Sequence, residues 1–234
     1  MGLEELENAL FKRWQQERGY DTFITDGAPC PEQFAKEKTK ITFVLKEPHA
    51  FEEDGLDMRH LVDWYGGDSK NPNTWNNLTY WTQAILEDVD FSANISIEDR
   101  IRWLKRISFL NLKKVGGKSS ATSAEIWDYA KDDAVYIYEQ LSIYKPDIIV
   151  CCGLLGNKAV ADCLAELVFD YKGDWQHRKE GDFFCWFYTQ LPEKIGQTAV
   201  LNFYHPLNLG TGHTNKELFD IMVELSQKIN RGGL

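Results

Sequence analysis

The sequence lacks a hydrophobic run long enough to cross a membrane. No apolar stretch reaches the roughly 18 to 20 residues that a membrane-spanning helix needs. The opening stretch, MGLEELENALFKRW, has an acidic amphipathic pattern without the apolar centre of a signal peptide. We therefore expect a soluble, cytoplasmic protein with no membrane partner.

Cysteine is scarce, and its spacing excludes the common metal motifs. The five cysteines are Cys30, Cys151, Cys152, Cys163 and Cys185. They include no CxxC pair and no Cys/His spacing of the zinc type. The adjacent pair lies in the apolar stretch PDIIVCCG, which is typical of small buried side chains. We expect reduced structural thiols, no metal site and no cofactor; metal or redox chemistry is the alternative.

The chain also lacks an excess of positive charge. Its 26 Lys and Arg against 36 Asp and Glu give a net charge of -10, which argues against a broad nucleic-acid surface. One stretch differs, because seven basic residues and no acidic one lie between Arg100 and Lys118. They are Arg100, Arg102, Lys105, Arg106, Lys113, Lys114 and Lys118. This basic stretch is either a solvated helix face with a loop or a local phosphate-binding patch.

What the sequence does contain is an alternation of helical and strand-like segments, without repeats or low-complexity tracts. This alternation predicts a layered α/β fold, and the length suits one domain spanning residues 1–234. The predicted helices are Leu3–Arg18, a short one within MRHLVDWY, Thr74–Leu86, one beginning near Ser96, Ser123–Tyr144, Leu155–Phe169 and Lys216–Ile229. Between the first helix and the first strand, Gly27–Glu32 is predicted to be a loop.

Four predicted core strands end in polar or small residues. The strands are Ile41–Leu45, RISFLNL ending at Asn111, Pro146–Gly153 and a segment from Thr198. Their tails read KEPH, NLKK, CCGL and YHPLN. If the strands are parallel, all four tails meet at one edge of the sheet, where α/β proteins commonly hold their ligands. The aromatic stretch Asp182–Thr189 predicts an added strand.

These four tails, in this order, resemble the motifs of the uracil-DNA glycosylase superfamily. LKEPH matches a first motif with a carboxylate or amide before proline, and Asn111 matches the asparagine that follows the family's second strand. PDIIVCCG and His205-Pro206 match the third and fourth motifs. The resemblance implies a three-layer α/β/α sandwich around a four-stranded, mostly parallel sheet, here with an extra strand. Some members hold an iron–sulfur cluster on four spaced cysteines, which this chain lacks.

The resemblance also implies roles for individual residues. Glu47 would orient water or stabilise the sugar cation, and His205 would hydrogen-bond the departing base. Asn111 would read the pyrimidine edge bidentately, accepting from N3–H and donating to O4. Further base-recognition candidates are Lys46, His49, Phe51 and Trp64. Candidates for contacts to DNA are Lys113, Lys114, Lys118, Leu207, Asn208 and Leu209.

Each assignment has a structural alternative. Glu47 could pair with Lys46 or Arg59, Asn111 could close a turn, and His205 could hydrogen-bond backbone. The aromatic rings could be ordinary packing, and His49 has no assigned chemistry. The sequence also departs from the family, with Leu45 in place of the first motif's glycine and Leu207 in place of a serine after His-Pro.

The sequence therefore predicts a DNA glycosylase that removes uracil or a related damaged base. Two alternatives stay open. One is a catalytically inactive member that binds nucleic acid or protein, and the other is an enzyme acting on free nucleosides or nucleotides.

Overall fold

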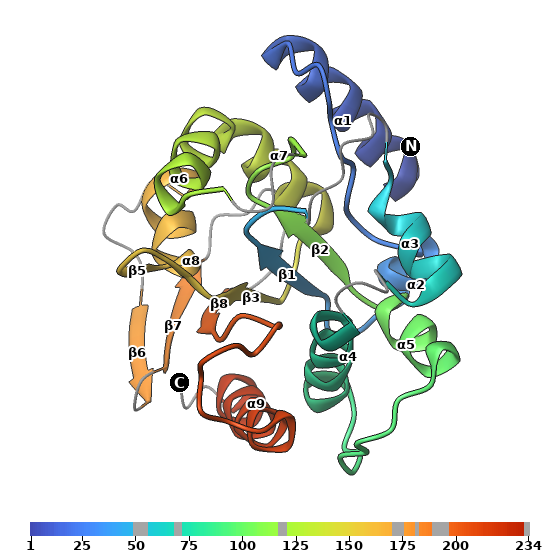
Figure 1. The fold of residues 1–234 in the computed structure, drawn as a ribbon, viewed down its shortest axis with the longest axis vertical. Helices are drawn as coiled ribbons and strands as arrows, with labels where there is room; N and C mark the ends of the chain where they lie inside the picture. Colours follow the sequence, from blue (N-terminus) through green and yellow to red (C-terminus); the bar gives the residue numbers. More distant parts are fainter. Residues whose placement is uncertain are drawn as a thin grey trace.

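The computed structural model describes residues 1–48, 56–67, 72–116, 121–169, 176–180, 183–188 and 197–231. For residues 176–180 and 183–188 it describes the backbone only. The candidates His49, Phe51 and Lys118 lie outside the described residues. The fold is α/β, with helices on both faces of one sheet (Figure 1). The predicted three-layer sandwich is confirmed.

Four parallel strands form the centre of the sheet in the order β2-β1-β3-β8. They are β2 (Ser108–Asn111), β1 (Ile41–Leu45), β3 (Ile148–Cys152) and β8 (Thr198–Phe203). In register, Leu45 pairs with Asn111 and Cys152 with Phe203. All four carboxyl ends therefore lie at one edge, as the sequence predicts. Burial on both faces explains why these strands are nearly continuous runs of apolar residues.

The added strand is one half of a hairpin. β7 (Phe183–Tyr188) runs antiparallel to β8, and β6 (Gln176–Glu180) runs antiparallel to β7, so the sheet has six strands. The sequence analysis missed β6. Its sequence, QHRKE, has none of the β-branched or aromatic residues typical of strands, and it is paired only on one side.

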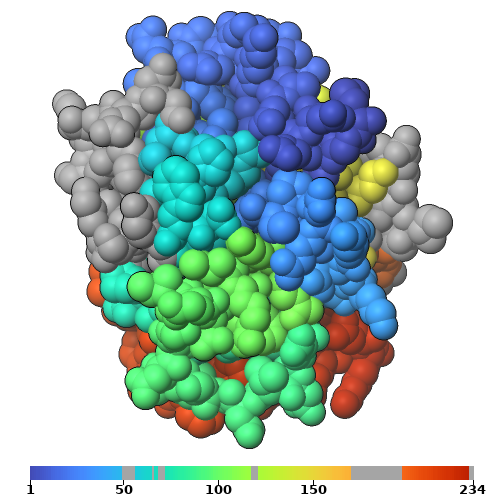
Figure 2. Space-filling model, turned by 90° about the vertical axis from the view of Figure 1, so that its right-hand side faces the viewer, coloured from blue at the N-terminus to red at the C-terminus, as the bar shows by residue number. Residues whose placement is uncertain are grey.

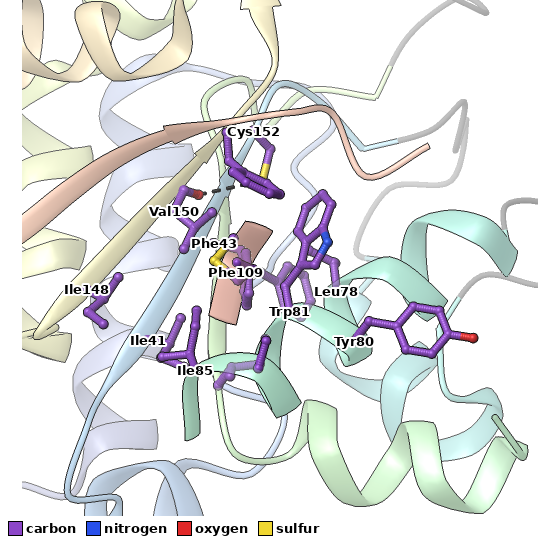
Figure 3. Close-up of a cluster of buried hydrophobic side chains, with 14 of the residues drawn as sticks. Ile41, Phe43, Leu78, Tyr80, Trp81, Ile85, Phe109, Ile148, Val150 and Cys152 are labelled. Carbon is purple, nitrogen blue, oxygen red and sulfur yellow. Dashed lines mark hydrogen bonds between the residues drawn. The ribbon is translucent and has the colours of Figure 1, made fainter. Parts of the chain in front are cut away.

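Two layers of helices bury the two faces of the sheet. The first layer contains α1 (Leu3–Arg18), α6 (Ser123–Asp132), α7 (Ala134–Tyr144), α8 (Val160–Cys163) and the π-helix η1 (Leu164–Val168). The second contains α3 (Met58–Tyr65), α4 (Pro72–Leu86), α5 (Ile97–Leu104) and α9 (Asn215–Asn230). Figure 3 shows Phe43, Trp81, Phe109 and Val150 in this second core, between the sheet and α4.

Several helix boundaries differ from the prediction. The predicted single helix Ser123–Tyr144 is broken at Asp133 into α6 and α7, and Thr122 is the N-cap of α6. The prediction of one helix from Leu155 to Phe169 was wrong, since a hairpin of β4 (Leu154–Leu155) and β5 (Lys158–Ala159) comes first. The loop predicted at Gly27–Glu32 leads into a short helix, α2 (Pro31–Lys36). Ser96 caps α5 as expected, accepting from Asp99 N.

The outer edge of β2 is covered rather than open. The backbone N of Ile24 donates to Lys114 O, and Phe109 N donates to Gly27 O, so the segment 24–27 runs antiparallel beside the strand. An uncovered edge would expose unpaired backbone groups. On this side of the molecule α1, α2, α3 and α5 meet at the surface (Figure 2). In the described part of the chain, no helix has both the length and the apolar character to span a bilayer.

Candidate active site

The polar residues after the parallel strands lie along one edge of the sheet. Glu47 follows β1, Asn111 ends β2, Gly153 follows β3 and His205 follows β8. Adjacent strands are about 5 Å apart, so the β1 tail is one spacing from the β2 tail and about 10 Å from the β8 tail. Among the described residues, no hydrogen bond or ion pair joins Glu47, Asn111 and His205 directly.

Glu47 is held by two donors at the mouth of the sheet. Its Oε1 accepts from the backbone N of Ala121 at 2.8 Å, and its Oε2 faces Lys113 Nζ at 3.5 Å. Its side chain keeps 21% of its accessible surface. The alternative pairing with Lys46 or Arg59 is not what the structure has, since Arg59 pairs with Glu7 and Asp57. A carboxylate offers about four acceptor positions, so Glu47 retains room for a water or a ligand.

Lys113 links Glu47 to helix α6. Its ammonium donates to Glu125 Oε1 at 2.8 Å and lies 5.3 Å from the ring centre of Tyr129. Burial disfavours the ammonium, but the hydrogen bond that it donates to Glu125 and the charges of Glu47 and Glu125 outweigh this effect and raise the pKa of Lys113. Lys113 is therefore a fixed cation whose ammonium lies 3.5 Å from the Glu47 carboxylate.

His205 is neutral at physiological pH. Burial, and secondarily the charge of Lys46, lowers its pKa from 6.5 to about 4. The Lys46 ammonium itself donates to Leu154 O at 3.3 Å, between the β1 and β3 tails. Lys46 thus acts on His205 through its charge. Among the described residues, no contact of Lys46 supports its prediction as a base-recognition residue.

The tautomer of His205 follows from the one hydrogen bond described for its ring. The backbone N of Leu207 donates to His205 Nδ1 at 3.2 Å, so Nδ1 is the unprotonated nitrogen. The proton of the neutral ring is then on Nε2, for which no described residue is an acceptor. A neutral imidazole presenting Nε2–H can donate to an oxygen on which negative charge develops. His205 also begins a turn, because Asn208 N donates to the His205 carbonyl oxygen at 2.9 Å.

Two neighbours fix the position of this histidine. Gly153 has φ +88°, and a Cβ there would lie 3.1 Å from His205 Cβ, so the β3 tail packs against the imidazole only because it is glycine. From α4, the fully buried Asn77 donates its Nδ2 to Pro206 O at 2.7 Å. The Oδ1 of Asn77 is buried without a described partner.

The loop after His205 is braced internally. Asn208 adopts φ +55°, and its Nδ2 donates to His213 O at 2.9 Å and Asn215 Oδ1 at 3.0 Å. Its side chain is therefore spent within the loop rather than offered to DNA. Leu207 is half-buried, whereas Leu209 is 77% exposed at the tip. Leu209 is thus the residue of this group placed to enter a partner.

Asn111 lies inside the protein, in a buried polar cluster at the β2 edge. Its Nδ2 donates to Asp26 Oδ2 at 3.1 Å, and it is 1% exposed. Asp26 also pairs with Lys114 at 2.6 Å, and both are fully buried. Burial lowers the pKa of Lys114 although Asp26 opposes the shift. The remaining members of the cluster are Glu7, Arg59, Gln140 and Tyr144.

The basic stretch is not an exposed strip. Lys113 and Lys114 are 3% and 0% exposed, so neither reaches a phosphate on the surface. Their assignment as DNA contacts needs correction, because both ammonium groups are buried against carboxylates, Lys113 against Glu125 and Glu47 and Lys114 against Asp26. Five members of the stretch pair with carboxylates: Arg102, Lys105, Arg106, Lys113 and Lys114.

Of the predicted stacking aromatics, the structure describes Trp64. It is 63% exposed on α3 and stacks on His60 at 5.3 Å between ring centres. On the same helix, six residues earlier, Met58 Sδ accepts from Asn111 Nδ2 at 3.5 Å. Trp64 therefore lies about 9 Å along the helix from that contact, on the surface rather than over the Asn111 amide.

Two residues that hold the site, Asp26 and Asn77, were missed from the sequence. Asp26 directly precedes the predicted loop Gly27–Glu32, and Asn77 lies in the middle of a helix. Neither residue is part of a local sequence motif that would mark it as a site residue. No group of three or more His, Cys, Asp or Glu side chains in the described ranges is arranged to hold a metal ion. Comparison with protein-family models and with curated proteins finds no match to this chain.

Proposed function

We propose that this protein hydrolyses the N-glycosidic bond of a pyrimidine, with uracil in DNA as its first expected substrate. The observation that carries the proposal is His205, a neutral histidine whose Nδ1 is occupied and whose Nε2–H has no acceptor among the described residues. It lies at the edge of the parallel strands that also carries Glu47. The motif resemblance likewise assigns Glu47 and His205 to one active site, Glu47 to the water or the sugar and His205 to the departing base.

In this reaction water adds to C1′ of the sugar while the bond from C1′ to the base nitrogen breaks. The bonding electrons leave with the base, so positive charge develops on the sugar and negative charge on the pyrimidine oxygens. The Glu47 carboxylate stabilises the positive charge on the sugar and accepts the proton of the water. His205 Nε2–H donates to the base O2 and stabilises the negative charge on the pyrimidine.

A second candidate is the same chemistry on free nucleosides or nucleotides, and the burial of Lys113 and Lys114 favours it. A DNA-binding enzyme needs exposed cations along its phosphate path. The groove of about 480 Å³ that Glu125 lines also carries Asp128 and Asp132, with Arg18 as its one basic lining residue, and this acidic excess would repel phosphates. A free nucleoside, which has no phosphate, would not meet this repulsion.

The test measures base release from a matched substrate set. Single-stranded and double-stranded oligonucleotides with one uracil are treated with alkali after incubation, and free deoxyuridine is analysed by chromatography for uracil. His205→Asn is expected to lower kcat by about 10²- to 10³-fold, because it removes one donor to the developing anion. Glu47→Gln is expected to lower it comparably. Glu166→Gln, at an exposed ion pair with Lys158, is the control and should retain activity.

The outcomes separate the candidates. Strand scission that both variants abolish supports the DNA glycosylase. Uracil release from deoxyuridine alone supports the nucleoside hydrolase. Binding of DNA without base release supports an inactive binding protein, and activity unchanged in both variants contradicts the proposed roles of Glu47 and His205.

A further inference from the structure

Asn77 is a buried polar residue in the middle of α4 that forms a hydrogen bond outside its own helix. It is fully buried, and its Nδ2 donates to Pro206 O at 2.7 Å. The buried Thr79 and Thr82 of the same helix instead donate to carbonyls of α4 itself. Asn77 Oδ1 has no hydrogen-bond partner among the described residues, which costs free energy at a buried position. Core packing alone would therefore favour leucine over asparagine here.

The carbonyl that Asn77 holds belongs to the same peptide unit as the N–H that bonds the His205 ring. Pro206 O and Leu207 N are joined by one peptide bond, and Leu207 N donates to His205 Nδ1 at 3.2 Å. The described residues contain no cis peptide bond. In a planar trans peptide the C=O and N–H groups point in opposite directions. Holding the oxygen toward Asn77 therefore holds the hydrogen toward the imidazole.

This peptide is the central one of the turn that begins at His205. Asn208 N donates to His205 O at 2.9 Å, so Pro206 and Leu207 are the two central residues. Proline at the first central position suits type I and type II turns, which differ in the direction of the central peptide. Leu207 does not have the positive φ that type II requires. In the type II direction, Pro206 O would face His205 Nδ1, and the ring proton would have to be on that nitrogen.

We propose that Asn77 is a positioning residue that holds the Pro206–Leu207 peptide in one direction and thereby keeps the ring proton of His205 on Nε2. Without the Asn77 amide, Pro206 O loses its described donor. A reversed peptide would regain one, because His205 Nδ1–H would then donate to that oxygen. The tautomer is a property of the free protein, whereas its part in stabilising a departing base rests on the proposed function.

The experiment determines the tautomer by nitrogen-15 NMR of the full chain with labelled histidine at pH 7. The His205 ring is neutral at this pH, so the chemical shifts of its two nitrogens show which one is protonated. His205→Asn identifies the signals by their loss. Wild type is expected to have the proton on Nε2. Asn77→Leu is expected to raise the ratio of Nδ1–H to Nε2–H about tenfold, since it leaves a buried carbonyl without its donor.

Two further variants separate positioning from a general loss of stability. Thr82→Val removes a buried hydrogen bond that stays within α4, and this matched control should keep the wild-type ratio. Leu207→Gly removes the steric barrier to a positive φ, yet it should also keep the wild-type ratio while Asn77 holds the carbonyl. Urea unfolding confirms that each variant is folded. Asn77→Ala, which also removes the donor, is measured beside Asn77→Leu.

The outcomes test the role of Asn77 separately from catalysis. A folded Asn77→Leu or Asn77→Ala chain with the wild-type ratio overturns the role, and so does a changed ratio in Leu207→Gly alone. A shifted ratio in the Asn77 variants without base release by wild type supports the role and contradicts the enzyme. A shifted ratio with kcat lowered in Asn77→Leu but not in Thr82→Val supports both. Wild type with its proton on Nδ1 overturns both.

Discussion

The polar residues at the carboxyl ends of β2 and β8 differ in whether the protein itself satisfies their hydrogen bonds. At the β2 end, Asp26 and Lys114 satisfy each other inside the protein, each fully buried. At the β8 end, Nδ1 of His205 accepts a hydrogen bond from its own loop, and its Nε2–H has no acceptor in the part of the chain that the structure describes. Both ends place polar residues after an apolar strand, so the pattern in the sequence is the same. The difference is in the partners: a polar group can act on a ligand only to the extent that the protein leaves it unsatisfied.

The comparison is tested most strongly by removing the cation at the β2 end. Lys114→Met leaves Asp26 buried without its charge partner, and we expect the free energy of unfolding to fall by about 3–5 kcal/mol. Urea denaturation at pH 7 measures it. Lys158→Met, which breaks the exposed pair with Glu166, is the control and should cost less than about 1 kcal/mol. Equal losses in the two variants would contradict the distinction between buried and exposed pairs.

At the β8 end, the depressed pKa of His205 predicts a pH dependence of stability. With a folded pKa of about 4 and an unfolded pKa of 6.5, the unfolded chain binds more protons between these values. The free energy of unfolding should therefore fall as pH drops from about 6.5 to 4, by up to about 3 kcal/mol. His205→Asn removes this contribution, so its unfolding curve should be flatter over that window. A slope identical to wild type would show that the imidazole is not buried in its neutral form.

Glycine at the β3 tail separates backbone strain from contact with the histidine. Gly153→Ala places a Cβ 3.1 Å from His205 Cβ at φ +88°, and we expect a loss of about 1–3 kcal/mol together with reduced activity. Gly156→Ala is the matched control, since it has φ +64° and no atom within 4 Å of the added Cβ. Gly156→Ala should lower the free energy of unfolding through backbone strain and leave activity unchanged. Thermal unfolding and base-release assays on both variants give the comparison.

The smallest effect on stability is expected at Glu47. Glu47→Gln keeps an acceptor for Ala121 N, and Lys113 retains Glu125 at 2.8 Å, so the loss should stay below about 1 kcal/mol. Its effect on base release should nevertheless be large. A large fall in unfolding free energy with unchanged activity would instead assign Glu47 to structure, like Asp26.

The candidate site was only partly predictable, and particular residues show why. Glu47 and His205 were found because each follows an apolar strand within a motif, which is local information. Lys113 and Lys114 were placed on the surface because their neighbours in sequence are basic. Of their carboxylate partners, Glu47 and Asp26 are 66 and 88 residues away, and Glu125 lies on the next helix. The added strand was found from its aromatic residues, but its partner β6 is polar and depends on β7 for pairing.

The sequence by itself determined the four core strands and most of the long helices, because apolar runs, caps and strand ends are local features of the sequence. It also determined that polar residues follow the β1, β2 and β8 strands. Only the tertiary structure decided which of those residues neutralise one another, since that depends on contacts between segments distant in the chain. For the same physical reason, the tautomer of His205 and the orientation of the Asn111 amide follow from the atoms packed around them and not from the motifs that contain them.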